Sequence, residues 1–231
     1  MTSSATGTTP VSNDTTRRRF IAGFCLIGIS IVFAINPITH ILGSGASTGA
    51  TSISTIAMIG FLAPVTMILM IGSVFAITQL LRTKADRAGL IGGTLTLMGW
   101  AVSARIMVIS QLNAILQNGV EGVPPEALGL IFQSAPIIFV SIIPVGLMFP
   151  IGLIILGVTI FATRPVHPAI GVLLAIGGVL FPLGRAVGLP WAVVSTDMIL
   201  AATFALIAWQ ILARPEPWYA TSMESAVSAR A

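Results

Sequence analysis

Three charged side chains lie inside apolar stretches that are long enough to cross a membrane, and they are the best candidates for chemistry in this chain. They are Arg105 within residues 94–117, Arg185 within residues 169–187 and Asp197 within residues 191–213. An uncompensated guanidinium in hydrocarbon costs between about 3 and more than 10 kcal/mol, so such residues usually face the interior of a helix bundle or a polar cavity. The three side chains could therefore pair with one another or bind a small anion.

Counting residues along each stretch places the three charges at a similar depth. Arg105 and Arg185 each lie 17 residues beyond the start of their helices, at Ala88 and Pro168, which is ~26 Å at ~1.5 Å per residue. Asp197 lies ~10 Å from the start of a helix that runs in the opposite direction. All three are therefore expected in the outer half of the membrane. The polar residues that could extend this cluster are Asn36, His40, Gln111, Asn113 and Gln133.

Two interpretations of this cluster remain open. In one, Asp197 and an arginine form an ion pair that locks helices together, and the second arginine extends to the outer headgroups. In the other, the cluster lines a pocket with excess positive charge, suited to an anionic or polar small molecule or a lipid headgroup. We predict that Asp197 pairs with Arg105 rather than Arg185, because ~12 further helical residues hold Arg105 within the membrane whereas Arg185 stands beside an outer turn.

The remaining motifs do not support catalysis or a metal site. The two histidines, His40 and His167, are expected about a membrane thickness apart, so they cannot share a metal or a haem. The single lysine, Lys84, lies in a turn and cannot form a Schiff base inside the bundle. Residues 45–49 read G-A-S-T-G, but a loop between membrane helices lacks the strand and helix that a nucleophile elbow requires. We therefore expect no catalytic residues, metal or cofactor, and an enzyme is only the third interpretation of the chain.

The composition is that of a polytopic membrane protein. Of the 231 residues, 55% are hydrophobic and only 8% are charged, and the mean hydropathy is +1.01. The net charge of +4 comes from basic residues beside apolar stretches, where membrane topology accounts for them, so nucleic-acid binding is not expected. A chain of this length holds about six helices of ~20 residues and no separate soluble domain.

Polar turns divide the chain into six predicted membrane helices in an all-α fold. The helices are expected at residues 18–40, 52–82, 88–117, 127–163, 169–187 and 191–213. The fourth is longer than one crossing needs and contains Pro136, Pro144 and Pro150, so we expect it to bend or to begin with an interfacial turn. Residues 1–16 are expected to be a disordered cytoplasmic tail, residues 17–214 a single transmembrane domain and residues 215–231 a second cytoplasmic tail.

The basic residues predict the orientation of these helices. Nine of the eleven lie in the turns and tails on one side of the predicted helices: Arg17, Arg18, Arg19, Arg82, Lys84, Arg87, Arg164, Arg214 and Arg230. Cytoplasmic loops carry an excess of Lys and Arg, so both termini are expected in the cytoplasm. A shift of 80 residues also superposes Pro64 on Pro144 and Arg105 on Arg185, which would fit a duplicated hairpin formed by helices two and three and by helices four and five.

The segment IPVGLMFPIGLIILGVTIFATRPVHPAIGVLLAIGGVLFPLGR, from Ile143 to Arg185, is followed by Asp197 in the last helix. This pattern resembles small bacterial multi-pass membrane proteins that are grouped only as domains of unknown function. The resemblance covers the last three helices, implies a protein of the bacterial inner membrane and brings no activity with it.

The expected function of the chain rests on the polar cluster. We expect transporter-like or sensor-like binding of a small polar or anionic ligand, or of a lipid headgroup, at this cluster. The alternative is a non-catalytic accessory or structural subunit in which the Arg/Asp pair holds helices together. Membrane lipids are the expected partners, together with further copies of the chain or a larger membrane complex.

Overall fold

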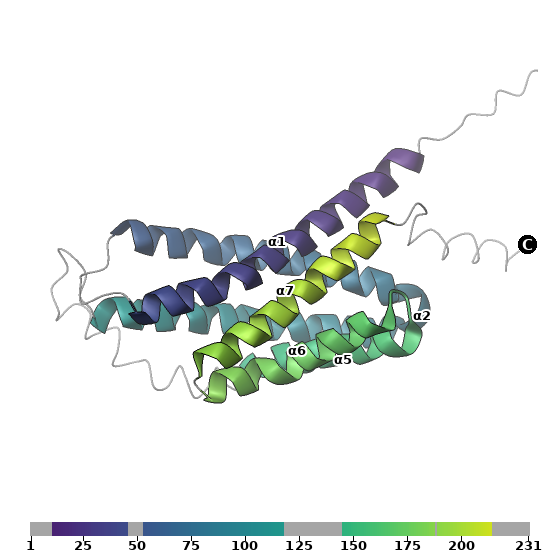
Figure 1. Ribbon diagram of the computed structural model, residues 1–231. Helices are drawn as coiled ribbons and strands as arrows, with labels where there is room; N and C mark the ends of the chain where they lie inside the picture. The colour runs from purple at the N-terminus through teal and green to yellow at the C-terminus, as the bar shows by residue number, and fades with distance from the viewer. Residues whose placement is uncertain (1–10, 46–52, 118–144, 188, 214–231) are drawn as a thin grey trace, which may run out of the picture.

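The computed structural model describes residues 11–45, 53–117, 145–187 and 189–213, and almost all of them are helical. In chain order the helices are α1 (Val11–Gly45), α2 (Ile53–Gln117), α5 (Met148–Thr163), α6 (Pro168–Val187) and α7 (Pro190–Ala213) (Figure 1). The predicted all-α fold is confirmed for this part of the chain. α1 begins at Val11, so residues 11–16 of the expected tail are helical, whereas residues 1–10 and 214–231 lie outside the described residues.

Four of the helices are long and apolar enough to cross a membrane. The qualifying segments are Thr16–Asn36, Pro64–Val102, Pro168–Val187 and Trp191–Ala213. α5 is apolar but has only 16 residues, and residues 127–144 of the long stretch predicted before it lie outside the described residues. These lengths and compositions are those of a membrane protein.

The 65 residues of α2 form two helical limbs rather than one straight rod. Ala85 has φ −156° and ψ 56°, which is not helical, and the chain folds back on itself at this point (Figure 1). The reversal lies within the predicted basic turn at residues 82–87. α2 therefore supplies two antiparallel limbs to the bundle, as expected for the second and third predicted helices.

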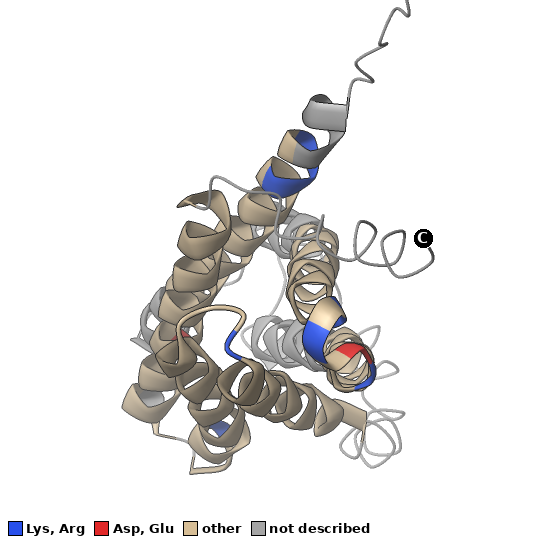
Figure 2. Ribbon diagram, turned by 90° about the vertical axis from the view of Figure 1, so that its right-hand side faces the viewer, with Lys and Arg blue, Asp and Glu red and all other residues tan. Residues whose placement is uncertain are grey.

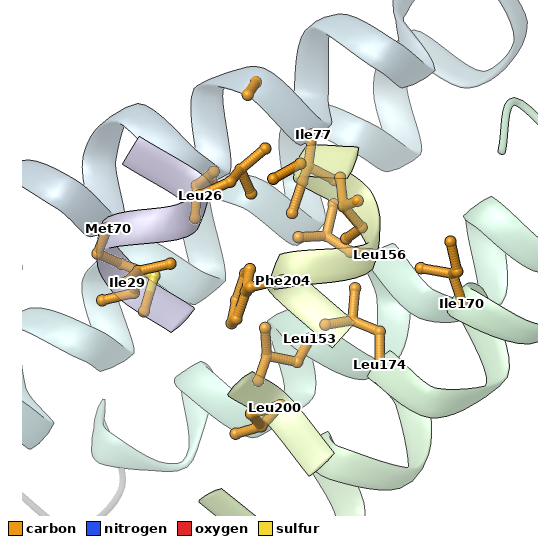
Figure 3. Packing of buried hydrophobic residues seen from close by; sticks show 14 of the residues in the cluster. Leu26, Ile29, Met70, Ile77, Leu153, Leu156, Ile170, Leu174, Leu200 and Phe204 are labelled. Atoms are coloured by element: carbon orange, nitrogen blue, oxygen red, sulfur yellow. The ribbon is translucent and has the colours of Figure 1, made fainter. Parts of the chain in front are cut away.

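The helices pack in a ring. α1 contacts α2 and α7, α5 lies between α2 and α6, and α6 contacts α7, which closes the ring (Figure 2). Fully buried side chains from every helix meet inside it, including Leu26, Met70, Leu153, Leu174 and Phe204 (Figure 3). Large apolar side chains also cover the outside. A helix that is apolar all round belongs in a membrane or in the core of a large protein, and this bundle has no further protein layer among its described residues.

α5 approaches its two neighbours closely because glycine stands at the contact points. A Cβ atom added to Gly99 of α2 would lie 1.9 Å from the backbone nitrogen of Phe149. On the other side of α5, a Cβ on Gly157 would lie 2.6 Å from the carbonyl oxygen of Gly171, and one on Gly171 would lie 2.5 Å from the carbonyl oxygen of Gly157. Small residues of this kind let helix backbones approach each other in a membrane.

One end of the bundle carries a group of basic residues. The start of α1, the turn of α2 and the link between α5 and α6 all lie toward this basic end, onto which Figure 2 looks. Two of its cations bond to helix carbonyls: Arg19 Nη2 donates to Leu212 O at 2.7 Å and Lys84 Nζ donates to Thr163 O at 2.9 Å. Both carbonyls belong to last turns of helices, where the helix dipole favours positive charge.

Candidate functional site

The end of α6 and the start of α7 lie opposite the basic end, and they position the charged residues of the site. Only residues 188 and 189 separate these two helices, so they form a tight antiparallel pair. Pro190 begins α7, a position where its missing N–H costs no helical hydrogen bond. Gly184 packs against α7, since a Cβ there would lie 3.0 Å from the carbonyl oxygen of Ala192. Residues near the end of α6 therefore face the first turns of α7.

Arg185 and Asp197 form an ion pair across this α6–α7 contact. Arg185 Nη2 lies 3.1 Å from Asp197 Oδ1 and 3.4 Å from Oδ2. Asn36 of α1 donates from Nδ2 to Asp197 Oδ2 at 2.7 Å. Hydrogen bonds to an ionised partner are roughly twice as strong as neutral ones, so this polar triad of Asn36, Arg185 and Asp197 ties three helices together.

The two charges of the triad differ in their access to the surroundings. The Asp197 side chain has 0% of its surface exposed, whereas 29% of the Arg185 side chain is exposed. A buried carboxylate needs hydrogen bonds to offset its lost hydration, and Asp197 receives them from α1 and α6. The triad therefore presents its cation, and not its carboxylate, to the outside of the bundle.

Aromatic packing holds the guanidinium of Arg185 in place. Its Cζ atom lies 3.6 Å from the centroid of the Phe181 ring, and Nη1 donates to the carbonyl oxygen of Phe181 at 3.4 Å. Stacking of a guanidinium over an aromatic face is attractive, more so where water is excluded. Phe181 in turn meets Phe149 edge-on, with ring centroids 4.7 Å apart. Arg185 is thus joined by packing to the bundle core as well as by charge to Asp197.

Two exposed tryptophans mark the depth of the triad along α7. Trp191 is 67% exposed and Trp209 is 71% exposed, and their separation of 18 positions corresponds to ~27 Å of helix. Tryptophan is enriched at both membrane interfaces, which lie ~30 Å apart. Asp197 follows Trp191 by six residues, or ~9 Å of helix.

The prediction that Asp197 does not pair with Arg185 is wrong, because Arg185 forms an ion pair with Asp197. The side chain of Arg105, the predicted partner, lies outside the described residues. Helical side chains point back toward the N-terminus of their helix. Arg185 lies near the C-terminal end of α6, so this direction carries its guanidinium away from the outer turn and down to the level of Asp197. The expectation that Arg185 extends to the headgroups overlooked this direction.

Of the other predicted site residues, one joins the cluster, and the side chains of the rest lie outside the described residues. Asn36 was expected to extend the polar patch, and it bonds directly to Asp197. The backbones of His40 in α1 and of Arg105, Gln111 and Asn113 in α2 are helical, but their side chains lie outside the described residues, as does the whole of Gln133. Phe181 was missed, although its i, i+4 spacing to Arg185 on one helix face is a signal that the sequence contains.

The geometry of the triad suits structure more than acid–base chemistry. Asp197 is enclosed and its two carboxylate oxygens already accept hydrogen bonds from Asn36 and Arg185. In the described part of the chain, no three or more His, Cys, Asp or Glu residues come together in a way that could hold a metal ion. What the triad can do directly is hold α1, α6 and α7 in register and offer one partly exposed guanidinium to an anion.

The chain matches no family model, and comparisons with curated proteins and with solved structures found no match either.

Proposed function

We propose that this chain is a non-catalytic integral membrane subunit of the bacterial inner membrane, with six spans and both termini in the cytoplasm, in which the polar triad acts as a helix–helix lock. α1, the two limbs of α2, α5, α6 and α7 supply six crossing segments that alternate in direction. Residues 145–147 precede α5 and bring that segment to 19 residues, or ~28 Å, close to the hydrocarbon thickness. We also propose that the chain contains a duplicated helical hairpin, in which the two limbs of α2 correspond to α5 and α6.

The gathering of basic residues at one end of the bundle supports the proposed orientation, because such residues mark cytoplasmic turns. A cysteine introduced at Leu189, in the link between α6 and α7, should react with a membrane-impermeant thiol reagent in intact cells. A cysteine at Ala85 should react only after the cells are permeabilised. Cys25 is buried within α1 and should stay unlabelled in both samples. Labelling of Ala85→Cys in intact cells would overturn the proposed topology.

The observation that carries the lock is the burial of Asp197 between donors from two other helices. An ion pair of this kind contributes little compared with an apolar pair of similar shape, but removing one partner leaves an uncompensated buried charge. The lock therefore predicts a specific pattern. Asp197→Asn and Arg185→Gln should each lower the free energy of unfolding by about 3 to 5 kcal/mol, while the double variant should lose much less than the sum.

We would measure this double-mutant cycle by unfolding the purified protein with a denaturing detergent. Arg87→Gln removes one positive charge from the exposed turn of α2 and serves as the control for the loss of an arginine, with an expected change below about 0.5 kcal/mol. Strictly additive losses for Asp197→Asn and Arg185→Gln would show that the two residues do not act as a lock.

The exposed part of Arg185 favours a second candidate function, which is binding of a small anion or an anionic lipid headgroup. Purification in mild detergent separates the two candidates. A stoichiometric protein partner supports the subunit. A co-purified anion or lipid that is lost from the folded double variant supports the binding function instead.

A further inference from the structure

Two basic residues are brought together at the basic end, where the turn of α2 meets the link between α5 and α6. Lys84 Nζ donates to the carbonyl oxygen of Thr163 at 2.9 Å, and Thr163 is the last residue of α5. Arg164 follows Thr163 directly and caps the same helix, with its backbone N–H bonded to the carbonyl oxygen of Ile160. The turn and the link are therefore fixed to each other at this point. We call Lys84 and Arg164 the cation pair.

Both side chains of the cation pair are exposed and have hydrogen-bond donors to spare. A lysine ammonium has three N–H donors, of which Lys84 gives one to Thr163, and an arginine guanidinium has five. In the described part of the chain the Arg164 side chain has no partner, and Asp86 in the turn of α2 forms no ion pair with either cation. Uncompensated cations with available N–H groups recognise phosphate oxygens, and arginine does so through two parallel bonds.

Arg164 also has a backbone conformation that usually belongs to glycine. Its φ of 51° and ψ of 48° are left-handed, and no other non-glycine residue in the described ranges has a positive φ. Glycine adopts this conformation at helix ends without steric cost, whereas a residue with a Cβ atom is strained there. Backbone strain of this kind is concentrated at functional sites. The strain therefore points to a function for the arginine side chain.

We infer that the cation pair binds the phosphate of an anionic phospholipid in the cytoplasmic leaflet. Exposed apolar side chains lie on the membrane side of the pair. Phe161 precedes Arg164 by three residues in α5, and Leu90 follows Lys84 by six residues in α2. These side chains suit the acyl chains of a lipid, whereas a free phosphate would make no use of them. Basic clusters on the cytoplasmic side of membrane helices attract anionic lipids in this way. The inference rests on the proposed membrane topology and concerns the end of the bundle opposite the polar triad.

The test uses the full-length protein in phosphatidylcholine vesicles that contain a small fraction of a lipid with a photoactivatable group beside its phosphate. In about 0.1 M salt the phosphatidylglycerol analogue should label peptides of the cation pair about 20-fold more than the phosphatidylcholine analogue, because each basic residue contributes about fivefold. In about 1 M salt, where the Debye length is about 3 Å, this preference should largely disappear. Both leaflets contain the probe, so the result does not depend on the orientation of the protein.

Arg164→Gln removes one member of the cation pair and should lower the preference about fivefold. Arg17→Gln is the matched control, because it removes one exposed arginine from the first turns of α1, which project beyond the other helices (Figures 1 and 2). With a Debye length of about 10 Å, it should lower the preference less than about twofold. Arg164→Gly separates charge from strain: it should lose the same preference as Arg164→Gln while the protein stays at least as stable as wild type, since glycine relieves the left-handed strain.

Equal labelling of the wild-type protein by the two analogues would overturn the inference. An equal loss of preference in Arg17→Gln and Arg164→Gln would do so as well, because the basic end would then act as a diffuse charged surface. Inorganic phosphate at the concentration of the probe lipid should leave the labelling unchanged, and its abolition would identify free phosphate as the ligand instead. If the cysteine-labelling experiment at Leu189 and Ala85 confirms the topology while these lipid experiments fail, only the lipid site is refuted.

Discussion

α5 and α7 are held in the ring by different means. α5 packs against α2 and α6 where glycine lets backbones touch, as at Gly99 and Gly157. α7 is bonded to its neighbours by polar side chains, including Ser30 Oγ, which donates to the carbonyl oxygen of Ala201 at 2.7 Å, and the two donors that meet Asp197. α5 therefore depends mainly on close backbone contacts at glycine, whereas α7 is held by polar side-chain bonds in addition to a glycine contact at Gly184.

The difference follows from the surroundings of a membrane helix. Lipid tails are as apolar as leucine, so burying one apolar helix face against another gains little, and helices associate through close packing and interhelical hydrogen bonds. A close-packed contact fails when an atom is added, and a polar contact fails when an atom is removed. The two helices should accordingly respond in opposite ways to small substitutions.

The largest effect among these small substitutions should come from adding one methyl group at the α2–α5 contact. Gly99→Ala would place its Cβ 1.9 Å from the backbone nitrogen of Phe149, which can move away only if the two helices separate. Overpacking of this kind costs about 3 kcal/mol or more when backbone must shift. Unfolding by a denaturing detergent measures the loss.

Gly28→Ala is the matched control for this substitution. The nearest atom to its added Cβ is Cδ2 of Leu69, the flexible end of a side chain. That side chain can rotate, and alanine is a better helix former than glycine by about 1 kcal/mol, so the control should change stability little in either direction. Equal losses for the two variants would mean that backbone contact is not what holds α5.

Removing an atom group from the α7 contacts should give the next largest effect. Asn36→Ala deletes one of the donors to the buried Asp197 carboxylate, and a hydrogen bond to a charged group contributes about 1.5 to 3 kcal/mol. In a background that carries Asp197→Asn, the same deletion should cost about 1 kcal/mol or less, because the acceptor is then neutral. If Asn36→Ala costs as much in that background as in the wild-type protein, Asn36 stabilises the bundle through contacts other than its bond to Asp197.

The order of the elements could be predicted from the sequence because charged turns punctuate it. The expected helices at 169–187 and 191–213 differ by one residue at their starts from α6 and α7, and the predicted break at 82–87 contains Ala85. Clusters of arginine and lysine are costly inside an apolar span, so the clusters at 82–87 and at Arg164 indicate where spans end. The predicted bounds of α1, residues 18–40, were less accurate than those of α6 and α7. The helix continues through polar residues at both ends and spans Val11–Gly45.

The sequence predicted that Asp197 belongs to a polar cluster, but not that Arg185 is its partner. Counting residues gives only the distance of Asp197 from the start of its helix, because the rise of a helix is constant. The choice between Arg105 and Arg185 depended on the direction of a side chain and on which helices are neighbours, and α7 lies between α1 and α6 in the ring. The close contact of Gly157 with Gly171 could not be found in the sequence at all, since it arises where two glycine-containing helix faces meet.

The smallest effect is expected at Lys84, whose polar bond to Thr163 joins α2 to α5. Lys84 Nζ donates to the carbonyl oxygen of Thr163 at 2.9 Å, but the lysine is exposed at the basic end, where water and headgroups compete for both groups. Lys84→Ala should therefore lower the free energy of unfolding by about 0.5 kcal/mol or less, like other exposed polar contacts. Arg87→Ala, a loss of the same charge in the same turn, controls for electrostatics. Should Lys84→Ala instead cost as much as Asn36→Ala, α5 would depend on polar bonds as α7 does, and the contrast between the two helices would fail.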